Sequence, residues 1–219
     1  RSDLSWKTSQ SPITFDDIYD GERYDARLEQ PGWNQPGFDE RNWNPAIAVT
    51  ETMGRLVSQS TVPPIRVVKA RAAMSMTNPA PGVYLYDFGQ NFSGWARLRI
   101  KAFPGAVIRL HFAELKDEKT DMLCANTNRN AEVLDVYTCK SSDWEEWQPR
   151  FTYHGFRYAE LSGDVGTPSI DTVEGRVVHT DVPRVGSFFC GNELINKIHS
   201  NYIWTQLSNL HGVPTDCCQ

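Results

Sequence analysis

The sequence contains no long apolar run and no excess of basic residues. None of its apolar segments approaches the roughly 20 residues that a membrane-spanning helix needs. Its 22 Lys and Arg residues are outnumbered by 27 Asp and Glu residues, so the formal net charge is −5 at pH 7. Nucleic acids and anionic membranes attract basic surfaces. We therefore expect neither a nucleic-acid partner nor a membrane partner.

Cysteine is scarce and shows no pattern. The 219 residues include five cysteines, an odd number, with no Cys-x-x-Cys spacing and no histidine at ligand intervals. This argues against a disulfide framework and against a zinc site. A bridge between the adjacent Cys217 and Cys218 would be strained. We expect free thiols at Cys124, Cys139, Cys190, Cys217 and Cys218.

Several catalytic motifs are also missing. The sequence has no phosphate-binding Gly-rich loop, no Gly-x-Ser-x-Gly and no His-Glu-x-x-His. These absences argue against a nucleotide-binding protein, an α/β-hydrolase and a zinc peptidase of the common types. We therefore expect no cofactor and no metal ion.

Turn-forming and aromatic residues are abundant. The chain has 13 Pro, 15 Gly, 7 Trp, 8 Tyr and 10 Phe. Such a composition is typical of many short strands joined by tight turns. It predicts a mainly β chain, arranged as an antiparallel, jelly-roll-like β-sandwich.

Alternating polarity marks the strands between residues 80 and 180. Residues 95–101 and 107–114 alternate apolar and polar side chains around a turn at 103–105, which predicts a hairpin. Residues 133–139, 151–161 and 173–180 continue the pattern. The predicted inward positions of the hairpin are Ala96, Leu98, Ile100, Ile108, Leu110 and Phe112.

The first 70 residues are rich in turns and poor in core residues. Pro-Gly pairs at 31–32 and 36–37 favour type II turns, and residues 22–28 alternate as a half-buried strand would. Residues 62–65 form an extended connector because each Pro restricts the residue before it. Either this stretch packs on the next one, or the other half of its core lies upstream.

Helical spacing begins after residue 191. Asn192 is a suitable N-cap, and Gly212 and Pro214 stop the predicted helix, which spans residues 192–211. Its broad apolar face needs a partner, either the sandwich or helices that follow. The chain then ends inside a Pro-Thr-Asp turn, so we expect a fragment cut where a second domain begins. The apolar positions are Leu194, Ile195, Ile198, Tyr202, Ile203, Leu207 and Leu210.

A few polar residues could carry chemistry. Asp216 follows the helix in a turn, where its carboxylate could point into a cleft, although spacing alone favours hydrogen bonds to neighbouring backbone amides. Glu114 ends a strand, and a solvated strand end is the favoured interpretation. No Cys or carboxylate lies at ligand spacing from His111, His154 or His179, so we expect structural histidines.

Two further patterns are ambiguous. The acidic run 16–22 suggests calcium, but Ile18 occupies a ligand position, which favours a solvated turn. Exposed tryptophans could stack on sugar rings, yet most should lie in the core or at packing surfaces. The candidates are Trp33, Trp43, Trp95, Trp144 and Trp147.

Four motifs together resemble one enzyme family. They are residues 86–95 (Tyr-Asp-Phe-Gly-Gln-Asn-Phe-Ser-Gly-Trp), 112–114 (Phe-Ala-Glu), 149–158 (Pro-Arg-Phe-Thr-Tyr-His-Gly-Phe-Arg-Tyr) and 213–217 (Val-Pro-Thr-Asp-Cys). The chain resembles the bacterial α-L-rhamnosidases of glycoside hydrolase family 78 along nearly its whole length. Supporting pieces occur in the same order at residues 20–27, 32–33, 63–65, 176–181 and 186–188.

The resemblance implies that separate domains provide the scaffold and the catalytic groups. Such enzymes carry accessory β-sandwich domains ahead of an (α/α)6 barrel that hydrolyses terminal α-L-rhamnosyl bonds with inversion, which requires a carboxylic acid and a carboxylate base. In the family the Pro-Thr-Asp-Cys turn opens the catalytic motif, so only Asp216 carries over, as a substrate-contacting carboxylate. The acid and the base are expected beyond Gln219, and the chain alone should be inactive. Cys218 stands where the family usually has Pro, which relaxes the φ restriction of the turn.

The resemblance also implies domain limits. Residues 1–70 would be the C-terminal part of an accessory sandwich, 71–182 a rhamnosidase sandwich, and 183–219 the linker and first barrel helix. The expected partner is a rhamnose-containing glycoside, bound through the parent enzyme, and the exposed helix could drive dimerisation of the fragment. The alternatives are a stand-alone carbohydrate-binding module and a structural spacer, and the spacer is favoured over the module for the central sandwich.

Overall fold

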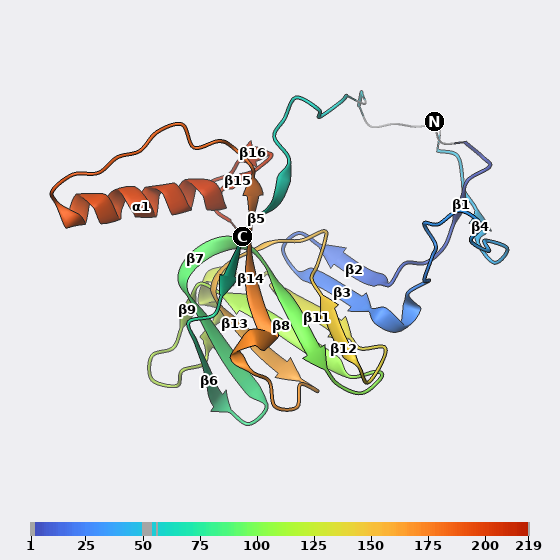
Figure 1. Cartoon of the computed structure of the whole chain (residues 1–219), viewed down its shortest axis with the longest axis horizontal. Coiled ribbons are helices and arrows are strands. Elements are labelled where there is room, and N and C mark those ends of the chain that lie inside the picture. Colours follow the sequence, from blue (N-terminus) through green and yellow to red (C-terminus); the bar gives the residue numbers. More distant parts are fainter. Residues whose placement is uncertain (1–2, 50–53, 56, 219) are drawn as a thin grey trace.

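A curled, ten-stranded β-sheet forms the body of the protein, and the one α-helix among the described residues projects from it (Figure 1). The structure is a computed structural model that describes residues 3–49, 54–55 and 57–218. The predicted mainly β sandwich with a C-terminal helix is confirmed. Within the described residues, no helix is both long and apolar enough to cross a membrane.

The strands of the sheet follow the order β2-β3-β11-β8-β13-β7-β14-β5, and β6 and β12 also pair with β7. Nearly all these pairings are antiparallel; β3 and β11 run parallel. The bounds are β2 Ile13–Asp17, β3 Gly21–Asp25, β5 Ile65–Ala72, β6 Ser75–Ala80, β7 Val83–Lys101, β8 Val107–Ala113, β11 Leu134–Thr138, β12 Trp144–Trp147, β13 His154–Gly163 and β14 Val173–Thr180.

Shorter elements lie outside this sheet. Three two-stranded ribbons pair β1 with β4, β9 with β10 and β15 with β16. Their bounds are β1 Lys7–Thr8, β4 Asn44–Pro45, β9 Leu115–Lys116, β10 Leu123–Cys124, β15 Leu210–His211 and β16 Val213–Pro214. Three short 3-10 helices are η1 Ala26–Leu28, η2 Ala125–Asn128 and η3 Ile170–Thr172.

Strand β7 belongs to both layers of the sandwich because it turns a corner at Gly94. Its first half pairs with β13 and β6, and from Gly94 onward it pairs with β14 and β12. Gly94 has φ +152°, and a Cβ there would overlap the carbonyl oxygen of Arg176. A glycine is therefore required where the sheet curls back over itself.

The predicted hairpin of residues 95–101 and 107–114 is wrong. The second half of β7 pairs with β14 and β12, whereas β8 pairs with β11 and β13. The turn at Phe103 therefore joins the two layers as an arch, closed by the Ala106 N–H donating to the Phe103 carbonyl (3.0 Å). Alternation identifies the buried face correctly, but a hairpin and an arch require the same alternation. All six predicted inward residues are buried.

The core is built around a cluster of phenylalanines. Phe156 packs against Phe92 and Phe112, with ring centroids 4.6 and 4.7 Å apart, and Phe88 meets Phe92 edge to face. All four side chains are fully buried. Burial of a side chain of this size contributes about 1.5–3 kcal/mol, so this cluster holds the strands of the sheet together.

The N-terminal stretch extends the central sheet. Strand β3 pairs in parallel with β11, and β2 pairs with β3, in agreement with the first of the two alternatives for this stretch. Strand β5 runs across the predicted domain limit between residues 70 and 71 and pairs with β14. The small β1–β4 ribbon lies apart from the sheet, on the opposite side from the helix (Figure 1).

Helix α1, Glu193–Ser208, begins as predicted. The Asn192 side chain accepts hydrogen bonds from the backbone N–H groups of Leu194 (3.0 Å) and Ile195 (3.4 Å). The helix ends three residues earlier than expected, because residues 210–214 form the β15–β16 ribbon around Gly212. Most of its apolar stripe is exposed, and the sandwich contacts mainly its C-terminal end, where Trp204 packs against the core.

Candidate functional site: the turn that carries Asp216

Asp216 lies in a turn that closes onto the end of α1. The Thr215 N–H donates to the Asn209 carbonyl (2.9 Å), which brings the turn back over the last helical residues. The Asp216 side chain is exposed, and no described residue donates a hydrogen bond to its carboxylate. Among the described residues no neighbouring backbone amide satisfies this carboxylate, in contrast to the interpretation that spacing alone favours, and its exposed oxygens can meet a ligand.

A hollow of about 440 Å³ opens beside Asp216. It lies between α1, the turn, the middle of β7 and the end of β8, and a tryptophan contributes the one aromatic side chain among the described residues of its lining. This combination of amide, hydroxyl and carboxylate groups with an aromatic ring suits a sugar, which presents both hydroxyl groups and an apolar face. The residues that matter most are Asn91, Glu114, Asn201, Trp204, Asn209 and Asp216.

Glu114 is not the solvated strand end that the sequence favours. Its Oε1 accepts a hydrogen bond from Asn91 Nδ2 at 2.6 Å, and the pair is partly buried in the wall of the hollow. The two residues are 23 positions apart, so no local pattern reveals the contact. The structure thus brings Glu114 and Asp216 to the same hollow, from the sandwich and from the turn.

Cys218 holds the end of the turn against the sandwich. Its side chain is 9% exposed and packs on Gly155 of β13. Burial raises the pKa of the Cys218 thiol to about 11, and the nearby Glu114 carboxylate adds to this shift. The adjacent Cys217 is exposed, so the two neighbouring thiols occupy different environments.

His211 holds the start of the turn region. Its ring stacks on Tyr153, with ring centroids 3.7 Å apart and planes inclined by 8°. Burial lowers the pKa of His211 to about 4, because the charged imidazolium would lose its hydration. The next N–H, of Gly212, donates to Thr180 Oγ1 at 2.7 Å. The β15–β16 ribbon is therefore fixed to the sandwich.

The three histidines considered in the sequence analysis have structural roles, as expected. His154 Nε2 lies 3.2 Å from Asp135 Oδ1 in the interior, and His179 Nδ1 lies 2.8 Å from the Thr180 carbonyl oxygen. Burial lowers the pKa of His111, with a further contribution from His154. Among the described residues there is no group of three or more His, Cys, Asp or Glu side chains that could hold a metal ion.

The acidic run 16–22 is only partly the predicted solvated turn. Asp17 Oδ1 accepts hydrogen bonds from the backbone of Tyr19 (2.8 Å) and Asp20 (3.0 Å), as a turn residue would. Glu22, however, is fully buried, and its Oε2 accepts from the N–H groups of Arg150 (2.9 Å) and Phe151 (3.2 Å). These partners lie far along the chain, which is why the sequence does not reveal the burial.

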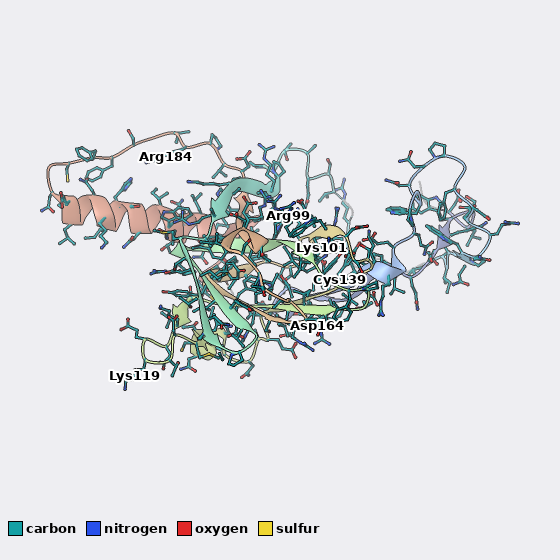
Figure 2. All side chains as sticks on the ribbon, turned by 60° about the horizontal axis from the view of Figure 1, so that its bottom comes forward. Arg99, Lys101, Lys119, Cys139, Asp164 and Arg184 are labelled. Atoms are coloured by element: carbon teal, nitrogen blue, oxygen red, sulfur yellow. The ribbon has the colours of Figure 1, made fainter. Side chains whose placement is uncertain are left out.

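All five cysteines are free thiols. Cys139 is buried among the strands, as Figure 2 shows. The same figure shows Arg184 on the loop that leads to α1, away from the sheet.

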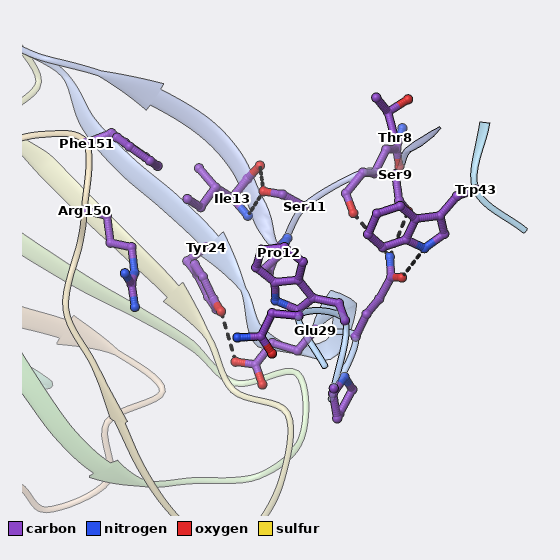
Figure 3. A pocket seen from close by; sticks show the side chains of 16 residues that line it. Thr8, Ser9, Ser11, Pro12, Ile13, Tyr24, Glu29, Trp43, Arg150 and Phe151 are labelled. Carbon is purple, nitrogen blue, oxygen red and sulfur yellow. Dashed lines mark hydrogen bonds between the residues drawn. The ribbon is translucent and has the colours of Figure 1, made fainter. Parts of the chain in front are cut away.

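The tryptophans divide between core and surface. Trp147 is buried and Trp144 is exposed beneath the Arg99 guanidinium, 4.5 Å from its ring centroid. Trp33 and Trp43 line a second hollow of about 850 Å³ in the N-terminal stretch (Figure 3), where Trp33 is 61% exposed. Packing explains the positions of some of these tryptophans, but the hollow lined by Trp33 and Trp43 is a second candidate site for sugar binding.

Comparison with known proteins agrees with this architecture. The family model of the α-L-rhamnosidase N-terminal domain matches residues 1–69, that of the bacterial α-L-rhamnosidase concanavalin-like domain matches 77–179, and that of the bacterial α-L-rhamnosidase 6 hairpin glycosidase domain matches 183–219. The three matches follow one another along the chain, so two N-terminal domain types of these proteins precede the beginning of their glycosidase domain. The chain belongs to the bacterial α-L-rhamnosidase family.

Individual relatives support this assignment. An α-L-rhamnosidase of Streptomyces avermitilis is 40% identical over 211 residues, which are 96% of this chain and 20% of that protein. One of Formosa agariphila is 34% identical over 220 residues, covering 99% of the chain and 23% of the relative. The chain thus spans about a fifth to a quarter of the length of these relatives.

Solved structures agree equally well. The α-L-rhamnosidase from Dictyoglumus thermophilum superposes with a TM-score of 0.96 at 50% identity, covering all of this chain and 25% of that one. The Streptomyces avermitilis α-L-rhamnosidase complexed with L-rhamnose gives a TM-score of 0.93 at 39% identity, covering 98% of this chain and 21% of that one.

Proposed function

We propose that the chain is the sandwich and first-helix region of an α-L-rhamnosidase that releases terminal α-L-rhamnosyl residues from glycosides or polysaccharides. Asp216 is the residue of this region that contacts the rhamnosyl group. The observation that carries the proposal is the exposed Asp216 carboxylate, to which no described residue donates a hydrogen bond, beside a hollow of about 440 Å³ lined with polar groups and Trp204. A free carboxylate of this kind can accept hydrogen bonds from sugar hydroxyl groups.

The proposed reaction inverts the anomeric centre. It requires one carboxylic acid to protonate the leaving oxygen and one carboxylate, far enough away to admit water, to activate that water. We assign both roles to residues beyond Gln219. The residues of this chain then bind and orient the sugar, and the proposed division 1–70, 71–182 and 183–219 separates two scaffold parts from the beginning of the catalytic part.

The test separates binding from turnover. The purified chain should not hydrolyse an aryl α-L-rhamnoside, and L-rhamnose should bind it weakly in ligand-observed NMR. Asp216→Asn should abolish the binding signal because it removes the negative charge but keeps the size of the side chain. Asp143→Asn, an exposed turn aspartate outside the hollow, is the matched control. Turnover by the chain, no binding by the unaltered chain, or unchanged binding by Asp216→Asn would each contradict the proposal.

A second candidate is carbohydrate binding without cleavage at the N-terminal hollow. The exposed Trp33, which lines the same hollow as Trp43 and Tyr24, carries this alternative, because aromatic rings stack on the apolar faces of sugars. Trp43 Nε1 donates to Gln30 Oε1 at 2.9 Å, which holds one ring of the set in place. If plant oligosaccharides quench the tryptophan fluorescence of the chain but not of Trp33→Ala, this second function is supported; equal quenching in both excludes it.

The proposed partner set also includes a second copy of the chain. The stripe of α1 exposes Leu194, Ile198 and Tyr202, and contiguous apolar surface favours association. Nucleic acids and membranes stay outside the proposed set because of the net charge of −5.

A further inference from the structure

Gly155 on β13 lies directly beneath the last residues of the chain. A Cβ at this position would overlap the Cys218 sulfur and would lie 2.9 Å from the Cys218 carbonyl oxygen and 3.3 Å from its Cβ. The backbone of Gly155 does not have a positive φ, and it pairs with Ser93 as an ordinary strand residue. Its lack of a side chain therefore serves the close approach of Cys218 and not a special backbone conformation.

Cys218 is the buried exception in an exposed segment. Of the described residues 212–218, all are exposed apart from Cys218. Cys218 thus provides the one buried side chain among the described residues of this segment. The depression over Gly155 is where that side chain fits, and we call this contact the Cys218 seat.

The other end of the same segment is fixed to the same part of the sandwich. His211 stacks on Tyr153, two residues before Gly155, and the Gly212 N–H donates to Thr180 Oγ1. Asp216 therefore lies between two points of attachment, at residues 211 and 218, that both rest on the start of β13 or just before it. The free carboxylate is carried by a turn that is held at both ends.

We infer that Gly155 and Cys218 are positioning residues: their contact holds the turn so that the Asp216 carboxylate faces the hollow beside Asn91 and Glu114. The sandwich is then more than a spacer, because it orients a group of the sugar site across a domain boundary. This inference rests on the proposed function of Asp216. The geometry of the seat itself does not depend on that function.

Thiol reactivity tests the seat without reference to sugar. Iodoacetamide reacts with exposed thiolates, so Cys217 provides an internal reference for Cys218 in the same peptide by mass spectrometry. In the unaltered chain Cys218 should react at least ~10-fold more slowly than Cys217, since it is buried and its pKa is raised to about 11. Gly155→Ala should bring the two rates within roughly threefold, because the new methyl group occupies the seat.

Two further variants keep the result interpretable. Gly186→Ala is the matched control, because Gly186 has an ordinary φ and nothing lies within 4 Å of the position that its new methyl group would take. Cys218→Ala removes the sulfur that fills the seat and leaves Gly155 unchanged, so it should also weaken L-rhamnose binding. Circular dichroism and the melting curve of each variant establish that the sandwich is folded.

Binding of L-rhamnose then separates the possible failures. We expect Gly155→Ala to weaken binding by roughly 10-fold, a change that requires only loss of carboxylate orientation. If Cys218 stays protected in folded Gly155→Ala, the seat is wrong. If Cys218 becomes reactive while rhamnose binding is unchanged, and Asp216→Asn abolishes binding, the positioning role is wrong and the proposed function stands. If Asp216→Asn binds rhamnose normally, the proposed function fails and the positioning role fails with it.

Discussion

The His211 ring lies flat on the Tyr153 ring, with centroids 3.7 Å apart, and this contact joins the C-terminal ribbon to the sandwich. The pKa of His211 is lowered to about 4 by burial, with the nearby His179 adding to the effect. The ring is therefore neutral in the folded protein at neutral pH. Its stacked position depends on that neutrality.

We predict that the ribbon detaches in acid. A histidine titrates near pH 6.5 when unfolded, so the unfolded state binds more protons than the folded state between about pH 6.5 and pH 4. The stabilisation is complete above pH 6.5 and is lost as the pH falls toward 4. The protection factor of the Gly212 amide, which compares its exchange rate with that of an unstructured peptide at the same pH, should fall over this interval, and His211→Phe, which can stack but cannot ionise, should remove the fall. His199→Phe is the control, and equal pH dependence in His211→Phe would contradict the prediction.

Glu22 should produce the opposite pH dependence. Burial raises its pKa, against the hydrogen bonds from Arg150 and Phe151 that lower it. The folded state then binds more protons than the unfolded state just above the ordinary pKa of a glutamate, so this stabilisation is present below that pKa and declines as the pH rises through the folded value. Glu22→Gln should reduce the loss of unfolding free energy as the pH rises, because a neutral amide oxygen can still accept from both backbone N–H groups. Urea unfolding at pH 5 and pH 8 measures the difference.

Truncation at the same position should be costly. Glu22→Ala removes a fully buried side chain and leaves the part-buried N–H groups of Arg150 and Phe151 without their acceptor; a donor left unsatisfied away from water costs about 1–3 kcal/mol. We expect the free energy of unfolding to fall by about 3 kcal/mol at neutral pH. A loss below about 0.5 kcal/mol, the range of ordinary surface substitutions, would show that water replaces the carboxylate.

Gly94→Ala should destabilise the corner of β7. A Cβ there overlaps the Arg176 carbonyl oxygen, and φ +152° is unfavourable for any other residue. Backbone strain of this kind costs about 1–3 kcal/mol before the steric overlap is added. Urea unfolding should report a loss of about 3 kcal/mol or more, whereas Gly186→Ala should stay within about 0.5 kcal/mol of the unaltered chain.

The exposed stripe of α1 should cause concentration-dependent association. Ile198 is exposed, and a lysine in its place would interrupt the apolar surface at its centre. Sedimentation velocity over a hundredfold concentration range should detect dimers in the unaltered chain and fewer in Ile198→Lys. Ser200→Lys adds the same charge elsewhere on the helix surface and should leave association unchanged. Equal association in both variants would exclude the stripe as the contact.

Local patterns predict several features correctly. Alternation in residues 95–101 and 107–114 identifies every inward side chain, and the residue type and position of Asn192 identify it as an N-cap. These features depend on the direction of a side chain or on backbone groups two or three residues away. Neighbouring residues determine such short-range geometry.

Local patterns do not predict contacts between residues that are far apart in the sequence. Glu22 meets Arg150 and Phe151 across 128 and 129 positions, and Glu114 meets Asn91 across 23. The alternation predicts a hairpin where β7 and β8 form an arch, because it does not specify which strand lies alongside. These errors concern partners, and none of them concerns which side of a strand is buried.

The sequence alone determined the mainly β class, the buried faces, the helix start and, through its long motifs, the resemblance to α-L-rhamnosidases. Only the tertiary structure decided that no described residue pairs with the Asp216 carboxylate, that Glu114 shares its hollow, and that Cys218 rests on Gly155. The physical reason is that side-chain direction follows from the local backbone. Which residues face one another across a hollow depends on how the sheet curls and on where the chain returns to it.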